Sequence, residues 1–276
     1  MRSFARICKG SANTLIFLCL LMLLAIPLTA FADEALDEDG IFASVRVYDG
    51  IEPADQDEIA RQAAEGFLPI MNSSEGFVGY YLLSAEDGLV AISLFRTPEA
   101  ASASTEAARD FVAENLAPLL PNPPLVVEGN AGLNYVVPLD DMTAEMDDES
   151  ETEDEMMVAK GITTLYASVR IYTGFDMQHL DEANKLAETH LIPVLKEGEG
   201  YFGSYTINDS GDTVVAITIY ESEEAALASH ANAAAFVAEY IADWLPDDPL
   251  RINGRLAVAA LAALHMGENL IVTMME

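Results

Sequence analysis

The chain has 276 residues, of which 51% are hydrophobic and 21% charged, a composition typical of a globular protein and not of a disordered one. A net charge of −33 gives a surface that repels phosphate backbones and anionic lipids, so nucleic acid is not expected as a partner. The two cysteines, Cys8 and Cys19, lie near the start, and we expect neither a disulfide nor a cysteine-bound metal in the rest of the chain.

Residues 1–32 have the pattern of a secretory signal peptide. A basic start precedes an apolar run over residues 15–26, and Ala30 and Ala32 then occupy the −3 and −1 positions of a cleavage site. The run is shorter than the roughly 20 residues of a membrane span. We predict an extracytoplasmic protein, cleaved near Ala32 and not stably associated with a membrane afterwards. The alternative is an uncleaved N-terminal anchor.

From residue 42 the pattern predicts the element order β-α-β-β-α-β. The first strand covers residues 43–48, and a helix over about 54–71 presents an apolar face. Pro69 is expected to kink or stop its last turn. The face consists of Ile59, Ala63, Phe67 and Ile70.

Two strands precede a second helix. The first of them starts at Phe77, and the other covers residues 89–95. Thr97 is its predicted N-cap, and Pro98 stands in its first turn. A fourth strand is predicted over residues 125–128. The inner face of the second helix is predicted to consist of Ala100, Ala103, Ala107 and Phe111.

The same pattern returns in the second half of the chain. Residues 42–50 (FASVRVYDG) return as 166–174 (YASVRIYTG), and residues 90–95 (VAISLF) return as 215–220 (VAITIY). Further matches follow in the same order, which indicates an internal duplication.

The duplication divides the chain into segments. The two copies cover residues 42–138 and 161–262, and residues 263–276 form a C-terminal tail. Between the copies, residues 139–160 are dominated by acids, whose mutual repulsion predicts an extended linker.

The second and third strands of each copy are apolar on both sides of the pleat, so both faces of the sheet must be covered. Helices cover one face, and the other copy is the obvious cover for the second. We predict an α+β fold in which two tandem ferredoxin-like (βαββαβ) modules form an intrachain pseudo-dimeric α/β barrel. The protein itself would then be a monomer.

Arg-Val-Tyr-x-Gly on the first strand, a proline near the end of the first helix and Gly-Phe-x-Gly-Tyr resemble the antibiotic biosynthesis monooxygenase (ABM) module of the dimeric α/β-barrel superfamily. The resemblance covers roughly residues 42–137 and 166–260. It implies a ferredoxin-like fold that pairs through its sheets. Enzymes of the family oxidise phenolic or quinone-like polyketides without metal or flavin, or open haem, and other members have no known reaction.

Haem-opening relatives are similar to one another in an Asn on the first strand, a Trp on the third strand and a His on the second helix. His230 falls on that helix here, but the single tryptophan, Trp244, lies near the end of the helix and not on a strand. The resemblance therefore does not favour haem degradation, and no cofactor or metal is expected.

A cofactor-free oxygenase needs a base that generates a substrate anion, and a dry pocket to hold it. The catalytic candidates are His190, His230, Tyr205 and Trp244. All histidines lie in the second copy or its tail, so a histidine-based site would be single. Lone helical histidines and repeated strand tyrosines more often serve packing.

Arg46 and Arg170 are the candidates for ligand binding, because each lies between valine or isoleucine residues on a strand where a cation needs a partner. Either they bind an anionic ligand between the sheets, or each pairs with an acid or reaches solvent. We interpret the protein as an exported ABM-like tandem repeat that is non-catalytic or binds a small apolar or aromatic ligand. The alternative is a cofactor-independent monooxygenase of a small phenolic or quinone-like substrate.

Overall fold

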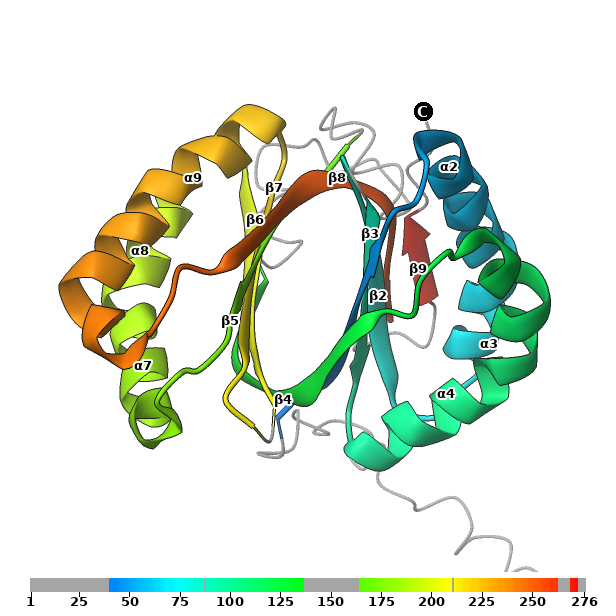
Figure 1. Ribbon diagram of the computed structural model, residues 1–276, viewed down its shortest axis with the longest axis horizontal. Helices are drawn as coiled ribbons and strands as arrows, with labels where there is room; N and C mark the ends of the chain where they lie inside the picture. The colour runs from blue at the N-terminus through cyan, green and yellow to red at the C-terminus, as the bar shows by residue number, and fades with distance from the viewer. Residues whose placement is uncertain (1–39, 87, 137–163, 210, 263–268, 273–276) are drawn as a thin grey trace, which may run out of the picture. The chain divides into compact units, whose positions relative to one another are not determined.

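A computed structural model describes residues 40–86, 88–136, 164–209, 211–262 and 269–272. The predicted signal peptide, the predicted linker and most of the predicted tail lie outside the described residues. Helices and strands follow in the order β-α-β-β-α-β in each half of the described chain (Figure 1). None of the described helices is both long and apolar enough to cross a lipid bilayer.

The elements of the first half are β1 (Phe42–Asp49), α2 (Pro53–Gln62), a π-helical turn η1 (Ala63–Phe67), α3 (Leu68–Asn72), β2 (Phe77–Ala85), β3 (Gly88–Phe95), α4 (Pro98–Phe111), a π-helical turn η2 (Val112–Leu116), a short 3-10 turn η3 (Ala117–Leu119) and β4 (Leu125–Val136). Those of the second half are β5 (Tyr166–Tyr172), η4 (Met177–His179), α7 (Leu180–Leu186), η5 (Ala187–Leu191), α8 (Ile192–Lys196), β6 (Tyr201–Asn208), β7 (Val214–Tyr220), α9 (Glu223–Phe236), η6 (Val237–Ile241), η7 (Ala242–Trp244), β8 (Leu250–Ala262) and β9 (Asn269–Val272).

Local sequence signals account for the helix ends. The Thr97 hydroxyl accepts a hydrogen bond from the Ala100 amide at 3.1 Å, which confirms the predicted N-cap. Pro69 does not stop the first helix, which continues to Asn72. The helix instead widens into the π-helical turn η1 just before the proline, which has no N–H to donate.

Eight antiparallel strands close into a barrel. They pair in the order β2-β3-β1-β4-β6-β7-β5-β8, and β2 also pairs with β8, while β9 adds to β8. The fourth strand of the first half is far longer than the predicted residues 125–128, because it pairs with strands of both sheets. In β4, residues 125–130 pair with β1 and residues 130–136 pair with β6. The α+β fold and the barrel are thus confirmed.

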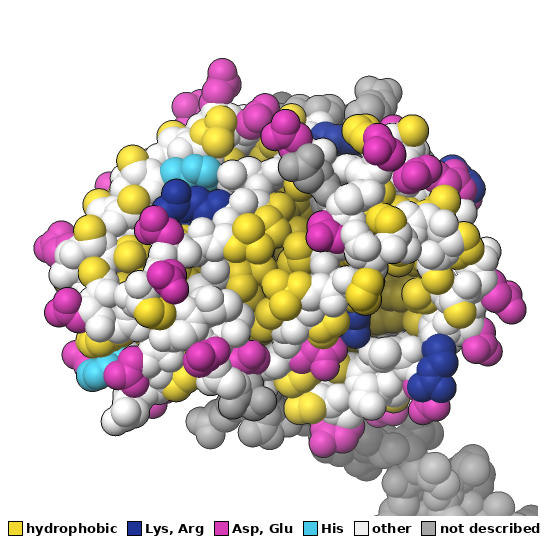
Figure 2. Space-filling view, viewed as in Figure 1, with side chains coloured by type: hydrophobic (Ala, Val, Ile, Leu, Met, Phe, Trp, Pro, Cys, Tyr) yellow, Lys and Arg dark blue, Asp and Glu magenta, His cyan; other side chains and the backbone are white. Residues whose placement is uncertain are grey.

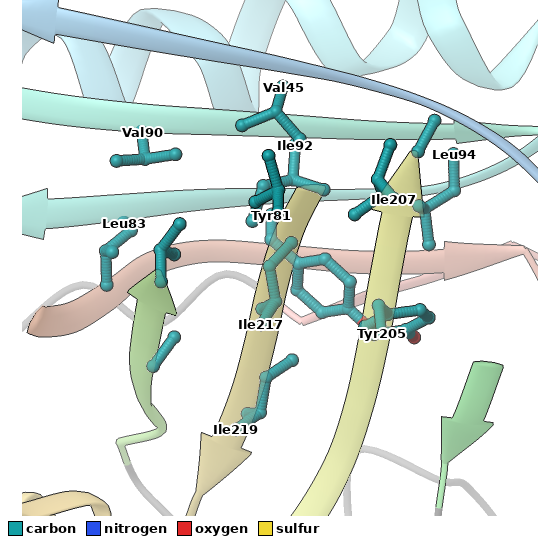
Figure 3. Packing of buried hydrophobic residues seen from close by; sticks show 14 of the residues in the cluster. Val45, Tyr81, Leu83, Val90, Ile92, Leu94, Tyr205, Ile207, Ile217 and Ile219 are labelled. Atoms are coloured by element: carbon teal, nitrogen blue, oxygen red, sulfur yellow. Dashed lines mark hydrogen bonds between the residues drawn. The ribbon is translucent and has the colours of Figure 1, made fainter. Parts of the chain in front are cut away.

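Side chains from both halves fill the inside of the barrel (Figure 3). Val45, Leu83 and Ile92 of the first half are packed with Ile207 and Ile217 of the second, and all five are 1% exposed or less. The apolar inner face of each sheet is therefore covered by the other half, as the sequence predicted. The barrel interior is a packed core.

The outer face of each sheet is covered by the helices of its own half (Figure 1). Ile59 and Ala63 are buried there, as predicted for the first helix. The predicted face of the second helix is confirmed in part: Ala100 and Phe111 pack against the core. The predicted Ala103 and Ala107 are exposed, and Ala101, Ser104 and Ala108 are buried instead.

Candidate functional site

The first half contains a cavity of about 370 Å³ between its helices and the outer face of the sheet. Tyr48, Phe67, Tyr80 and Phe95 give it aromatic walls, and the ring centres of Phe67 and Tyr80 lie 5.3 Å apart. Figure 2 shows this side of the molecule hollowed, with hydrophobic side chains in the hollow and Lys or Arg side chains near its edge. A cavity of this size and lining is typical of sites for small organic molecules.

The strand arginine of the first half lies at this cavity and is held by an acid. Arg46 donates from Nη1 to the Ser44 hydroxyl at 2.6 Å and from Nη2 to Oε1 of Glu128 at 3.2 Å. The Ser44 hydroxyl in turn donates to the same carboxylate oxygen at 2.8 Å. The charge of Arg46 is thus compensated by β4, and its direction at the edge of the cavity is fixed.

The titratable groups of the cavity do not include a base that works near neutral pH. Among the described residues, its lining contains no His, Asp, Glu or Lys, and its arginines are Arg46 and Arg109. Burial raises the pKa of the Tyr48 and Tyr80 hydroxyls, so both stay protonated at neutral pH. The lining can therefore donate hydrogen bonds and enclose an aromatic ring, but it does not offer general-base catalysis.

The corresponding cavity of the second half is much smaller, at about 90 Å³. One substitution between the halves accounts for part of the difference. In the first half Gly66 leaves room for the ring of Phe111, because a Cβ at this position would collide with that ring. The second half has His190 at this position, and Phe236, the counterpart of Phe111, lines the cavity instead.

Neither histidine candidate lines that cavity. His190 is exposed and stacks on Tyr240, with ring centres 4.5 Å apart. Nε2 of His230 lies 3.0 Å from the amide oxygen of Asn253 and 3.2 Å from the Ser168 hydroxyl. Burial, and then the charge of Arg170, lowers the pKa of His230.

The other two catalytic candidates lie elsewhere. Tyr205 is inside the barrel, where its hydroxyl is 3.0 Å from that of Tyr81, and burial raises its pKa well above the usual value. Trp244 stacks on His179 with ring centres 4.5 Å apart. The structure therefore does not bring the four candidates together.

Arg46 and Arg170 both line cavities beneath the helices, not the space between the two sheets, where an anionic ligand was one expectation. The reason is strand alternation: Val45 and Val169 point into the barrel, so the next residue points outward. Pairing with an acid, the other expectation, is confirmed for Arg46.

Sequence reasoning named Arg46 but missed the cavity that it lines, because all four catalytic candidates came from the second copy. A signal was available. Arg46 and Tyr48 alternate on one strand and Tyr80 follows on another, so all three face the same side.

Comparisons with known proteins concern the fold. No family model matches the sequence, and no curated protein matches it. A crystal structure of an anthrone oxidase-like protein is similar at a TM-score of 0.56 and 12% identity, over 84% of this chain and 98% of that one. A candidate monooxygenase from Fusobacterium nucleatum is similar at a TM-score of 0.58 and 11% identity, over 86% of this chain and 100% of that one. Another candidate monooxygenase, from Lactobacillus acidophilus, is similar at a TM-score of 0.55 and 11% identity, over 84% of this chain and 99% of that one.

These matches span both halves of the barrel, since one half alone would not cover 84% of the chain. At such low identity they concern the fold and not the chemistry. The chain shares the fold of these three structures, which in the described residues is an eight-stranded antiparallel barrel with helices on its outside.

Proposed function

We propose that this chain is an exported protein of two tandem ABM-like modules, and that the cavity of its first half binds a small aromatic compound bearing a hydroxyl group. The observation that carries the proposal is the cavity itself. It offers about 370 Å³ between aromatic walls, with hydroxyl groups and Arg46 at hand as hydrogen-bond donors. A fused barrel supplies both halves in one chain, so the protein would work as a monomer.

Binding is favoured over catalysis by the absence of a base among the described lining residues. Oxidation of anthrone by dioxygen, which gives anthraquinone and water, starts with removal of a proton from the ring carbon. Burial raises the pKa of Tyr48 and Tyr80, so both are protonated at neutral pH and neither holds a phenolate that could accept this proton.

The test is the affinity of the mature protein for 1-naphthol, 2-naphthol and anthrone, measured by calorimetry, with cyclohexanol as a non-aromatic control. Ala108→Leu extends a side chain into the cavity and should weaken binding about tenfold or more, since the space is then filled. Ala107→Leu on the exposed side of the same helix is the matched control and should bind as the wild type does.

Oxygen uptake measured with anthrone separates the two functions. We expect no uptake above the uncatalysed rate. Uptake that Ala108→Leu abolishes and Ala107→Leu retains would instead establish the cofactor-independent monooxygenase. Equal affinity of both variants for every aromatic compound would remove the cavity from the proposal.

A further inference from the structure

The second half buries an arginine that forms no ion pair with the residues that the structure describes. Arg170 is 5% exposed, whereas Arg46, its counterpart, is only partly buried. Its Nη2 group is buried without a hydrogen-bond partner among the described residues. A buried cation is costly unless a counter-charge accompanies it. The described residues therefore provide no anion for Arg170, and a bound anion would fill that place.

A change between the two halves explains the missing partner. Glu128, which binds Arg46, has a neutral counterpart in Asn253. The residue of β8 that pairs directly with Arg170 is Arg251, a second cation. Burial lowers the pKa of Arg170, and the charge of Arg251 acts in the same direction. Although the chain has a net charge of −33, two cations, Arg170 and Arg251, are neighbours here.

The cavity of about 90 Å³ is lined by Arg170 and by a polar group that can form a further hydrogen bond. Thr218 lines it as well, and the Thr218 hydroxyl is also buried without a partner among the described residues. The remaining walls include Phe175, Leu191 and Phe236. Because a water occupies about 30 Å³, the space holds about three waters or one small organic anion.

We infer that the cavity beneath α9 in the second half is a binding site for a small aliphatic carboxylate, whose oxygens meet Arg170 and Thr218 and whose methyl or ethyl group meets the apolar wall. A guanidinium group matches the two oxygens of a carboxylate. This site differs from the aromatic cavity of the first half, and the inference stands without the proposed function.

The first measurement is the affinity of the mature protein for acetate and propionate by calorimetry at constant ionic strength, with propionamide as the neutral control. The carboxylates should bind and the amide should not. If propionate and propionamide give the same response, water fills the cavity and the inference fails.

Variants locate the site. Arg170→Met and Thr218→Val should each weaken propionate binding about tenfold or more. Arg96→Gln, at an exposed arginine outside the cavity, should leave it unchanged. Binding that survives Arg170→Met in a folded protein would overturn the inference.

Asn253→Glu tests the inference in the opposite direction and does not depend on tolerance of Arg170→Met. It restores the acid that the first half has at this position, so the new carboxylate should occupy Arg170. We expect the variant to melt at a higher temperature than the wild type and to lose propionate binding. A variant that binds propionate as the wild type does would contradict the site.

Discussion

At the scale of single residues, the hydroxyl pair in the barrel is the only polar contact described between the two halves inside the packed core. Tyr81 and Tyr205 are equivalent residues of the two copies, and both are at most 2% exposed. Burial raises the pKa of Tyr81 to about 12, so the pair consists of two neutral hydroxyls. Each one satisfies the other, which keeps two polar groups tolerable in an apolar core.

A double-mutant cycle should show this dependence. Tyr81→Phe or Tyr205→Phe alone leaves one buried hydroxyl unsatisfied and should cost about 1–3 kcal/mol in the free energy of unfolding. The double variant removes both groups and should be about as stable as either single variant or more stable. The measurement is urea denaturation of all four proteins. Additive losses in the double variant would show that the hydroxyls act independently.

The sequence predicts some residue environments and not others. Strand alternation and the apolar spacing of the first helix give the buried faces correctly, because large side chains mark those faces. In α4, small residues occur on several sides of the helix, so the pattern does not single out Ala101 and Ala108. The cavity depends on how the helices pack on the sheet. The lack of a described partner for Nη2 of Arg170 depends on the register of β5 and β8, which sets Arg251 opposite Arg170 and Asn253 opposite Ser168.

At the scale of elements, β4 and β8 hold the barrel together because each leaves its own sheet and joins the other. Gly254 pairs with Ala167 of β5 and with Ala85 of β2, so it marks the passage. Gly129 is its counterpart on β4. A Cβ at Gly129 would collide with the carbonyl oxygen of Asn208, and one at Gly254 with that of Ser84. Neither backbone can approach its neighbour if a side chain is present.

Gly129→Ala and Gly254→Ala should each destabilise the protein by about 3 kcal/mol or prevent folding, because backbone and not a movable side chain blocks the new methyl group. Thermal unfolding followed by circular dichroism is the measurement. Gly40→Ala is the control, since its Cβ would meet the Ala131 oxygen at an ordinary 3.8 Å. A Gly254→Ala protein as stable as the control would show that the backbones of β8 and β2 can move apart to admit the methyl group.

The crossing strands also show where sequence reasoning about elements ends. A fourth strand was predicted over residues 125–128, where apolar residues are consecutive. The continuation to Val136 is stabilised by pairing with β6, more than 60 residues away. The β-propensity of residues 129–136 does not reveal a partner so distant in the sequence, so the end of this strand could not be predicted from the local sequence.

At the scale of the whole molecule, the two halves depend on each other through one core. The inner cluster draws side chains from every strand between β1 and β8. Separation of the halves would expose that cluster and leave the second parts of β4 and β8 without partners. Burial of apolar area is the main stabilising contribution to a fold, so the halves should not be stable apart.

The fragment 33–138 should therefore not exist as a folded monomer. We expect it to pair with itself or to aggregate, because Val45, Leu83 and Ile92 would otherwise face water. Light scattering after size-exclusion chromatography gives its mass, with residues 33–276, which we expect to be a monomer, as the control. Addition of the fragment 161–276 should convert it to a one-to-one complex, since the missing half of the core is then supplied. A soluble, cooperatively folded monomer of 33–138 would mean that each half forms its own core, and the mutual cover of the sheets would then not be what holds this barrel closed.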